Sequence, residues 1–94
     1  MTMADAPLLF RIHAIKRMAQ RGISVEEVRH VLDTGEVVED YPNDFPYPSA
    51  LMLGWSEERP LHVVSAIAPE TKIIITVYEP DLFRWEPDYK TRKL

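Results

Sequence analysis

Two glycines and a capping box fix one helix of this chain more firmly than any other element. Ser24 and Glu27 have the spacing of a reciprocal cap, in which each side chain accepts a hydrogen bond from the other residue's backbone N–H. Gly35 is a natural helix terminator, and Gly22 can end a preceding helix in a left-handed conformation. The stretch from Gly22 to Gly35 therefore predicts a helix with defined ends.

Apolar residues recur at helical spacing on both sides of Gly22. A first helix is expected from Ile12 to Arg21, with a buried stripe of four residues, Ile12, Ile15, Met18 and Ala19. The second helix should bury Val25, Val28, Val31 and Leu32. Ile23 is placed to pack on Val28 as a hydrophobic staple.

Strand patterns follow the helices. Four strands are expected, at Val37–Tyr41, Ala50–Trp55, Leu61–Ala68 and Lys72–Glu79. Three prolines between residues 41 and 49 predict an extended loop there, and the connection Pro69-Glu70-Thr71 makes the last two strands a hairpin. Residues 1–8 are interpreted as a loose leader and residues 81–94 as a polar, aromatic-bearing tail. We therefore expect one α+β domain, residues 1–94, with two N-terminal helices packed on a small, mainly antiparallel four-stranded sheet.

Composition removes several classes of protein. The chain has no cysteine, so a disulfide scaffold and a thiolate metal site are excluded. Its start does not resemble a signal peptide, and its longest apolar run, Ile73–Ile75, is far too short to span a bilayer, so a cytoplasmic protein without a membrane partner is expected. The three histidines have no metal-ligand spacing and the glycines form no phosphate loop, so neither a metal nor a cofactor is expected.

Charge is unevenly distributed along the chain. The net charge is −4, which argues against nucleic-acid binding by the chain as a whole. However, the stretch from Phe10 to Arg21 holds four cations and one histidine without any acid, whereas Glu36–Asp44 holds four acids without any base. This segregation is compatible with a local anion site on an acidic protein.

We hypothesise that one face of the first predicted helix is such an anion site. His13, Arg17 and Arg21 lie at positions i, i+4 and i+8, so they form one row. A phosphate would relieve the mutual repulsion of this row. The plainer interpretation is a solvated helix face.

The predicted hairpin carries a second cluster. A three-residue loop places His62 opposite Tyr78 and Val64 opposite Thr76, so that the polar side chains of His62, Thr76 and Tyr78 share a face. The opposite face should meet the helices with Leu61, Val63, Ile67, Ile73, Ile75 and Val77. The alternative is that the polar residues simply cover a solvated face. In the tail, Trp85 beside Arg84 fits either a core position or a base-stacking role.

The run His13–Ser24, HAIKRMAQRGIS, resembles the opening motif of DUF4258, a small prokaryotic domain family of unknown function. The similarity extends over about residues 12–92 and includes Glu39–Pro42, Pro46–Ser49, Arg59–Val64 and Ile75–Pro80.

This resemblance implies similarity to the RelE/ParE-like toxins, which are metal-independent ribonucleases or related toxins with N-terminal helices and an antiparallel sheet. It implies a neighbouring antitoxin of zinc-finger or helix-turn-helix type, and RNA as substrate. The positions that it marks are His13, Arg17, His62, Thr76 and Tyr78.

The expected function is therefore RNA cleavage by attack of a ribose 2′-OH on the adjacent phosphate. His13 and His62 would be the acid–base pair, Arg17 and Arg21 would hold the phosphate, and Tyr78 and Thr76 would orient groups or donate hydrogen bonds. The alternative is a protein- or anion-binding module of the same fold without catalysis. A further alternative is an interaction protein whose acidic Glu36–Asp44 segment docks a basic antitoxin.

Overall fold

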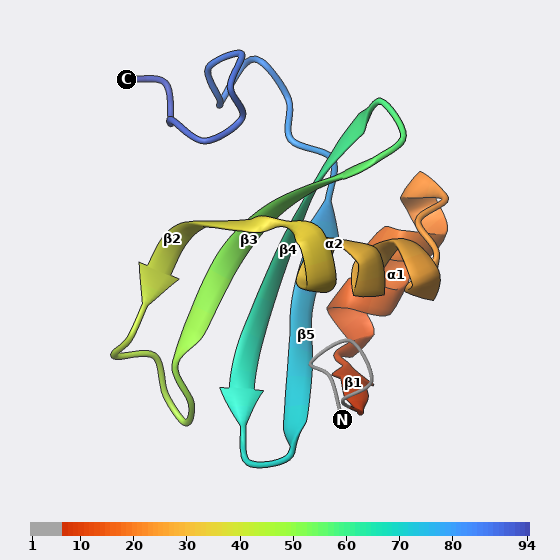
Figure 1. Ribbon diagram of the computed structural model, residues 1–94, viewed down its shortest axis with the longest axis vertical. Helices are drawn as coiled ribbons and strands as arrows, with labels where there is room; N and C mark the ends of the chain where they lie inside the picture. The colour runs from red at the N-terminus through yellow and green to blue at the C-terminus, as the bar shows by residue number, and fades with distance from the viewer. Residues whose placement is uncertain (1–6) are drawn as a thin grey trace.

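The structure, a computed structural model, describes residues 7–94. Its elements follow in the order β1 (Leu8–Phe10), α1 (Ile12–Arg21), α2 (Val25–Thr34), β2 (Glu36–Tyr41), β3 (Ser49–Ser56), β4 (Arg59–Ala68) and β5 (Thr71–Tyr78). The predicted α+β class is confirmed, and each of the two predicted helices and four predicted strands is present at nearly the expected residues. Both helices lie on one face of the sheet (Figure 1).

The sheet is mixed and has five strands instead of the predicted four. The strand order is β1-β5-β4-β3-β2, with β1 parallel to β5 and the other neighbours antiparallel. β1 was missed because three apolar residues carry no recognisable period, and the first of them, Leu8, lies in the segment interpreted as a loose leader. Residues 1–6 of that leader fall outside the described residues.

The helix ends are as predicted. Gly22 has φ 64° and its N–H donates to the carbonyl oxygen of Met18. The backbone N–H of Ser24 donates to Glu27 Oε1 at 2.9 Å, and the backbone N–H of Glu27 donates to Ser24 Oγ at 3.1 Å. At Gly35, where α2 ends, glycine is required by lack of space and not by a left-handed φ. A Cβ there would lie 2.5 Å from the carbonyl oxygen of Val31.

The predicted buried stripe of α1 was largely wrong. Met18 is buried, but Ile12 and Ile15 are 72% and 53% exposed, and Ala19 is exposed as well. Ala14 takes the central position instead with no exposed surface. The short connection from β1 fixes the rotation of this ten-residue helix, and the small Ala14 lets the backbone approach the sheet closely. In α2, Val28, Val31 and Leu32 are buried as predicted, whereas Val25 is 43% exposed.

The hairpin register is as predicted near His62 and Tyr78 and differs at the turn. His62 pairs with Tyr78 and Val64 with Thr76, but Ala68 pairs with Thr71, so the loop has two residues. A bulge absorbs the difference, because Ser65 pairs with Ile74 and leaves Ile75 as the extra residue. Because of the bulge, Ile74 joins the helix-side core, contrary to the predicted faces. Ile67, which was predicted to meet the helices, is exposed.

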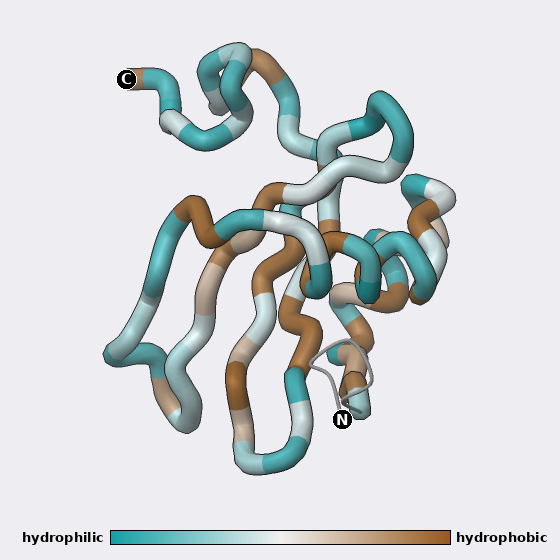
Figure 2. The backbone as a smooth tube through the Cα atoms, in the orientation of Figure 1, coloured by the Kyte–Doolittle hydropathy of each residue, from teal (hydrophilic) through white to brown (hydrophobic). Residues whose placement is uncertain are grey.

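The core lies between the two helices and the central strands. Its buried members are Ala14, Met18, Ile23, Val28, Val31, Leu32, Leu61, Val63, Ile74 and Val77. Apolar residues accordingly concentrate along β3 to β5 and on the helices, while the turns and the C-terminal segment, residues 79–94, are mainly hydrophilic (Figure 2).

The C-terminal segment contains no helix or strand beyond an isolated bridge between Trp85 and Arg92. It leaves the sheet where β5 ends, at the end of the molecule away from β1 (Figure 1). Trp85 is only 2% exposed, so of the two alternatives given for it the core position is confirmed. The segment is therefore a folded part of the domain, and it covers part of the sheet face opposite the helices.

Candidate functional site

A cleft of about 320 Å³ opens where α1, the end of β5 and the C-terminal segment meet. It exists because β1 pairs only with Lys72–Ile74 and leaves the edge of β5 from Thr76 to Tyr78 without a neighbouring strand. Ten residues line it: His13, Arg17, Arg21, Thr76, Tyr78, Glu79, Asp81, Arg84, Trp85 and Arg92.

Helix α1 supplies the predicted row of basic side chains. Ala14 and Met18 face the core, so the adjacent row of His13, Arg17 and Arg21 turns toward the free edge of β5. His13 and Arg21 are exposed and Arg17 is half-buried. The predicted row therefore forms one wall of a cleft rather than an open helix face.

The C-terminal segment supplies the wall that sequence reasoning missed. Asp81 Oδ1 accepts hydrogen bonds at 2.9 Å from the backbone N–H groups of both Phe83 and Arg84, which fixes the turn that carries Arg84 and Trp85. The available signal in the sequence was the alternation of aromatic and basic residues from Phe83 to Trp85. This alternation does not predict where the segment packs.

Arg92 attaches the end of this segment to the sheet. Its Nε and Nη2 donate to Glu39 Oε2 and Oε1 at 2.7 and 2.9 Å, and its guanidinium lies 4.6 Å from the centre of the Trp85 ring. Glu39 also accepts a hydrogen bond from the Tyr41 hydroxyl. The hydrogen bonds from Arg92, followed by that from Tyr41, lower the pKa of Glu39 to about 2.

His62 does not line the cleft but lies directly behind it. It is fully buried, and its ring contacts Trp85 and Tyr78 edge-on at centroid distances of 4.6 and 5.1 Å. Nδ1 lies 3.1 Å from the Tyr78 hydroxyl, and Nε2 lies 2.8 Å from the carbonyl oxygen of Tyr89. Both ring nitrogens are thus occupied, and His62 reaches the cleft only through Tyr78.

These contacts fix the direction of each hydrogen bond. The carbonyl oxygen of Tyr89 can only accept, so His62 Nε2 carries a proton and donates it. Burial lowers the pKa of His62, so the ring is neutral and Nδ1 has no proton. The Tyr78 hydroxyl must therefore donate to Nδ1, which leaves the lone pairs of its oxygen available to a group in the cleft.

The carbonyl of Tyr89 is held in position by an unusual backbone. Tyr89 has φ 57°, a left-handed conformation that is uncommon for a tyrosine. Asp88 stabilises the following turn, since its Oδ1 accepts from the backbone N–H groups of Lys90 and Thr91 at 2.8 and 3.0 Å. The C-terminal segment therefore orients the imidazole of His62 as well as covering it.

The charge balance of the cleft favours an anion. Four guanidinium groups and two carboxylates line it, a net charge of +2 with His13 neutral. Arg92 is engaged by Glu39, and Glu79 lies 3.7 Å from Arg59. Within residues 7–94, Arg17, Arg21 and Arg84 have no carboxylate partner.

Five of the six predicted site residues therefore meet in one cleft, namely His13, Arg17, Arg21, Thr76 and Tyr78. The sixth, His62, has the predicted partner Tyr78, but it does not face His13 across open space. The polar cluster was predicted on the sheet face away from the helices, and Thr76 and Tyr78 lie at the margin of the sheet, on its edge strand β5. The alternative that these residues cover a solvated face is wrong for His62, because Trp85 covers its ring.

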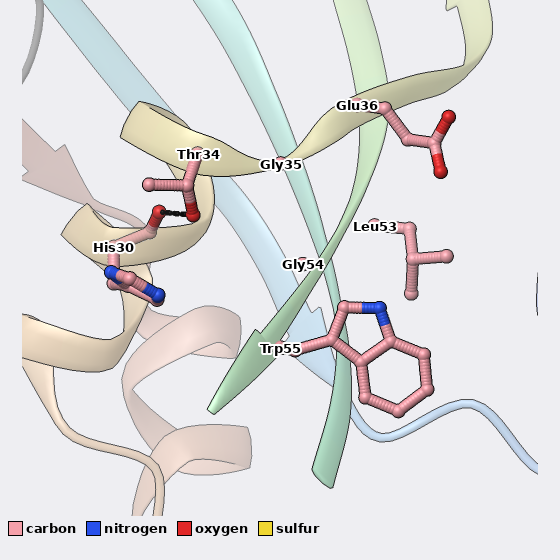
Figure 3. Close-up of a pocket in the computed structure, with 7 residues that line it drawn as sticks. All are labelled: His30, Thr34, Gly35, Glu36, Leu53, Gly54 and Trp55. Atoms are coloured by element: carbon pink, nitrogen blue, oxygen red, sulfur yellow. Dashed lines mark hydrogen bonds between the residues drawn. The ribbon is translucent and has the colours of Figure 1, made fainter. Parts of the chain in front are cut away.

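A second hollow, of about 260 Å³, lies beside the end of α2 (Figure 3). His30 and Trp55 flank it over a floor formed by Gly35 and Gly54. Its one carboxylate, Glu36, lies 3.3 Å from Lys90 Nζ. With a single histidine and no unpaired cation in its lining, this hollow offers no comparable chemistry.

The chain belongs to the family described as Domain of unknown function (DUF4258), which it matches over residues 10–79. No curated protein and no solved structure matches the chain significantly. The family match includes α1 and the whole of β5 to Glu79 but not the C-terminal segment, which supplies Arg84, Trp85 and Arg92 to the cleft. In residues 7–94 no helix is long and apolar enough to cross a bilayer, and no three histidine or carboxylate side chains converge as metal ligands would.

Proposed function

We propose that this protein is a metal-independent endoribonuclease that cleaves RNA by attack of a ribose 2′-OH on the adjacent phosphate. The observation that carries the proposal is the cleft that His13, Arg17 and Arg21 of α1 line together with Tyr78. This reaction needs a base at the 2′-OH, an acid at the leaving oxygen and cations on the phosphate. The cleft has a candidate for each.

The phosphate would be held by Arg17 and Arg21. Both reach the cleft from α1, and neither has a carboxylate partner among the described residues. Guanidinium groups bind phosphate oxygens in a bidentate manner and stabilise the charge that develops on them. Arg84 lies in the same lining and could bind a neighbouring phosphate, while the Thr76 hydroxyl could donate one further hydrogen bond.

Tyr78 and His62 together would act as the base. The 2′-OH proton passes to the Tyr78 oxygen while the proton of Tyr78 passes to Nδ1 of His62, so no phenolate accumulates. Burial raises the pKa of Tyr78 and lowers that of His62, so before the reaction the phenol is protonated and the imidazole is neutral, which are the states from which this relay starts. The nearby carboxylate of Glu39 favours the imidazolium that forms, and Arg92 opposes it.

His13 would act as the acid. As the bond between O2′ and phosphorus forms, the bond between phosphorus and O5′ breaks, and His13 in its imidazolium form protonates O5′. The products are a 2′,3′-cyclic phosphate and a 5′-hydroxyl end. His13 suits this role because it is exposed on α1 at the wall of the cleft, where a leaving group can be reached and released.

The resemblance to RelE/ParE-like toxins leads us to propose that this activity is toxic and is neutralised by an antitoxin of zinc-finger or helix-turn-helix type. The test is controlled expression of the wild type and of His13→Ala in a bacterial host, with growth and RNA integrity followed. Arrest with RNA cleavage by the wild type only supports the nuclease. Arrest by both proteins removes His13 from the mechanism.

The second candidate is an anion- or protein-binding module without turnover. The burial of His62 favours it, because only His13 of the two predicted acid–base residues is accessible to a ligand. In that case the arginines of the cleft bind a phosphate group that is not cleaved. Normal growth and intact RNA with soluble, folded wild-type protein would support this candidate.

A further inference from the structure

Phe83 is an apolar side chain held in the open beside the cationic cleft. It is 93% exposed, whereas Trp85 two residues later is only 2% exposed. Aromatic side chains gain most from burial, so an exposed one on a folded segment forgoes that gain. A partner that stacks on the ring of Phe83 would supply the favourable free energy of that burial.

The backbone around Phe83 is ordered by specific hydrogen bonds. Asp81 Oδ1 accepts from the N–H of Phe83 itself, and the carbonyl oxygen of Asp81 accepts from the N–H of Trp85 at 3.1 Å. The carbonyl oxygen of Arg84 accepts from the N–H of Lys93 at 2.8 Å. Phe83 is therefore presented on a fixed turn, which limits the conformational entropy that binding would cost.

The position of this turn identifies the chemistry of a ligand. Asp81, Arg84 and Trp85 all line the cleft, so Phe83 lies on the turn that borders it. Arg84, the next residue, has no carboxylate partner within residues 7–94. An aromatic ring beside free guanidinium groups is the combination that binds single-stranded nucleic acid, through base stacking and phosphate contacts.

We propose that Phe83 is a stacking platform for an unpaired base next to the phosphate held in the cleft, so that the protein selects single-stranded RNA. This inference rests on the proposed function and extends it to the class of substrate. Phenylalanine has no hydrogen-bonding group, so the platform accepts any base. Bases of a duplex are already stacked and cannot occupy it.

The test is binding of a fluorescently labelled single-stranded RNA in which every 2′-OH is methylated, so that no cleavage occurs. Anisotropy titrations compare the wild type with Phe83→Ala and Phe83→Trp. Loss of one stacked base should weaken binding about 5- to 150-fold in Phe83→Ala. Phe83→Trp should bind at least as tightly as the wild type.

Phe45 offers a matched control. It is 95% exposed and lies in the loop between β2 and β3, at the opposite end of the molecule from the C-terminal segment (Figure 1). Phe45→Ala removes the same side chain from an equally exposed position, and it should leave the Kd unchanged. Circular dichroism and thermal unfolding of Phe83→Ala should match the wild type, since the ring contacts no core.

The outcomes separate this inference from the proposed function. If Phe83→Ala binds like the wild type while Arg17→Ala/Arg21→Ala binds weakly, the stacking role is wrong and RNA binding by the cleft stands. If Phe83→Ala weakens binding to a duplex as much as to a single strand, selection of single strands is wrong. If the wild type binds no RNA at low salt, both proposals are overturned.

Discussion

The Nδ1 atom of His62 lies 3.1 Å from the hydroxyl oxygen of Tyr78, and this contact joins the covered face of the sheet to the cleft. The two residues are partners in the ladder between β4 and β5. Because Nε2 donates to a backbone carbonyl and burial favours the neutral ring, Nδ1 accepts the proton of the tyrosine, whose oxygen keeps its lone pairs for a further donor.

Tyr78→Phe should abolish most RNA cleavage. The change removes the group proposed to accept the 2′-OH proton, which typically contributes about 10²–10⁴-fold in rate. It also leaves buried Nδ1 without a donor, which should lower the free energy of unfolding by about 1–3 kcal/mol. Initial rates on a labelled RNA and chemical denaturation measure the two effects. Tyr47→Phe makes the same chemical change outside the cleft and should alter neither quantity.

His62→Gln should change the pH dependence of cleavage as well as its rate. Glutamine can still donate to the carbonyl of Tyr89, but it cannot take the proton of Tyr78. Because burial lowers the pKa of His62, the acidic limb of the wild-type profile should lie below pH 6.5. The variant should lack that limb. An unchanged profile with a reduced rate would leave His62 a purely structural role.

The same histidine should make the fold less stable in mild acid. In the unfolded chain it takes up a proton below about pH 6.5, whereas the folded state resists protonation because the pKa is lowered there. The contribution of His62 to the free energy of unfolding is therefore complete above about pH 6.5, and it is lost as the pH falls through the folded-state pKa. Thermal unfolding at pH 7.5 and 5.5 should give a larger difference for the wild type than for His62→Gln.

Arg17 and Arg21 should determine the salt dependence of RNA binding. Each phosphate contact contributes about 0.7 to the slope of log K against log salt concentration for a single strand. Arg17→Ala/Arg21→Ala should therefore reduce that slope by about 1.4. Lys16→Ala removes a neighbouring positive charge that does not line the cleft, and the slope should then be close to that of the wild type. Equal effects of the two changes would mean that binding is non-specific.

Two carboxylates should set the acid limit of stability. The pKa of Glu27 is lowered to about 2, first by the hydrogen bond from Ser56, and the pKa of Glu39 is lowered to about 2, first by Arg92. Both groups bind protons more readily when unfolded, so stability should be fully present above pH 4.5 and should fall toward pH 2. Glu27→Gln and Glu39→Gln should each flatten this decline in chemical denaturation. No change in the decline would exclude these two ion pairs as its origin.

Local signals in the sequence predicted much of the fold. The capping box of Ser24 and Glu27 and the left-handed Gly22 depend only on neighbouring residues, so they could be identified without the structure. The pairing of His62 with Tyr78 also followed from the sequence, although the loop was one residue shorter than expected and a bulge restored the register. β1 could not be predicted, because its strand partner is the edge of β5, far along the chain.

The candidate site was predictable for the residues on regular elements. The spacing of His13, Arg17 and Arg21 and the shared face of Thr76 and Tyr78 identified two walls of the cleft. The third wall depends on tertiary contacts of an irregular segment, namely Arg92 with Glu39 and Trp85 with His62. Sequence periodicity does not indicate contacts of this kind, so the burial of His62 could not be predicted.

The most direct test is incubation of the purified protein with a 5′-labelled single-stranded RNA in the presence of EDTA, with analysis of the product ends. We predict cleavage that leaves a 2′,3′-cyclic phosphate, is lost in His13→Ala and Tyr78→Phe, and fails when the nucleotide at the cleavage site is 2′-deoxy. Intact RNA after incubation with folded wild-type protein, or equal cleavage by the wild type and both variants, would contradict the proposed function.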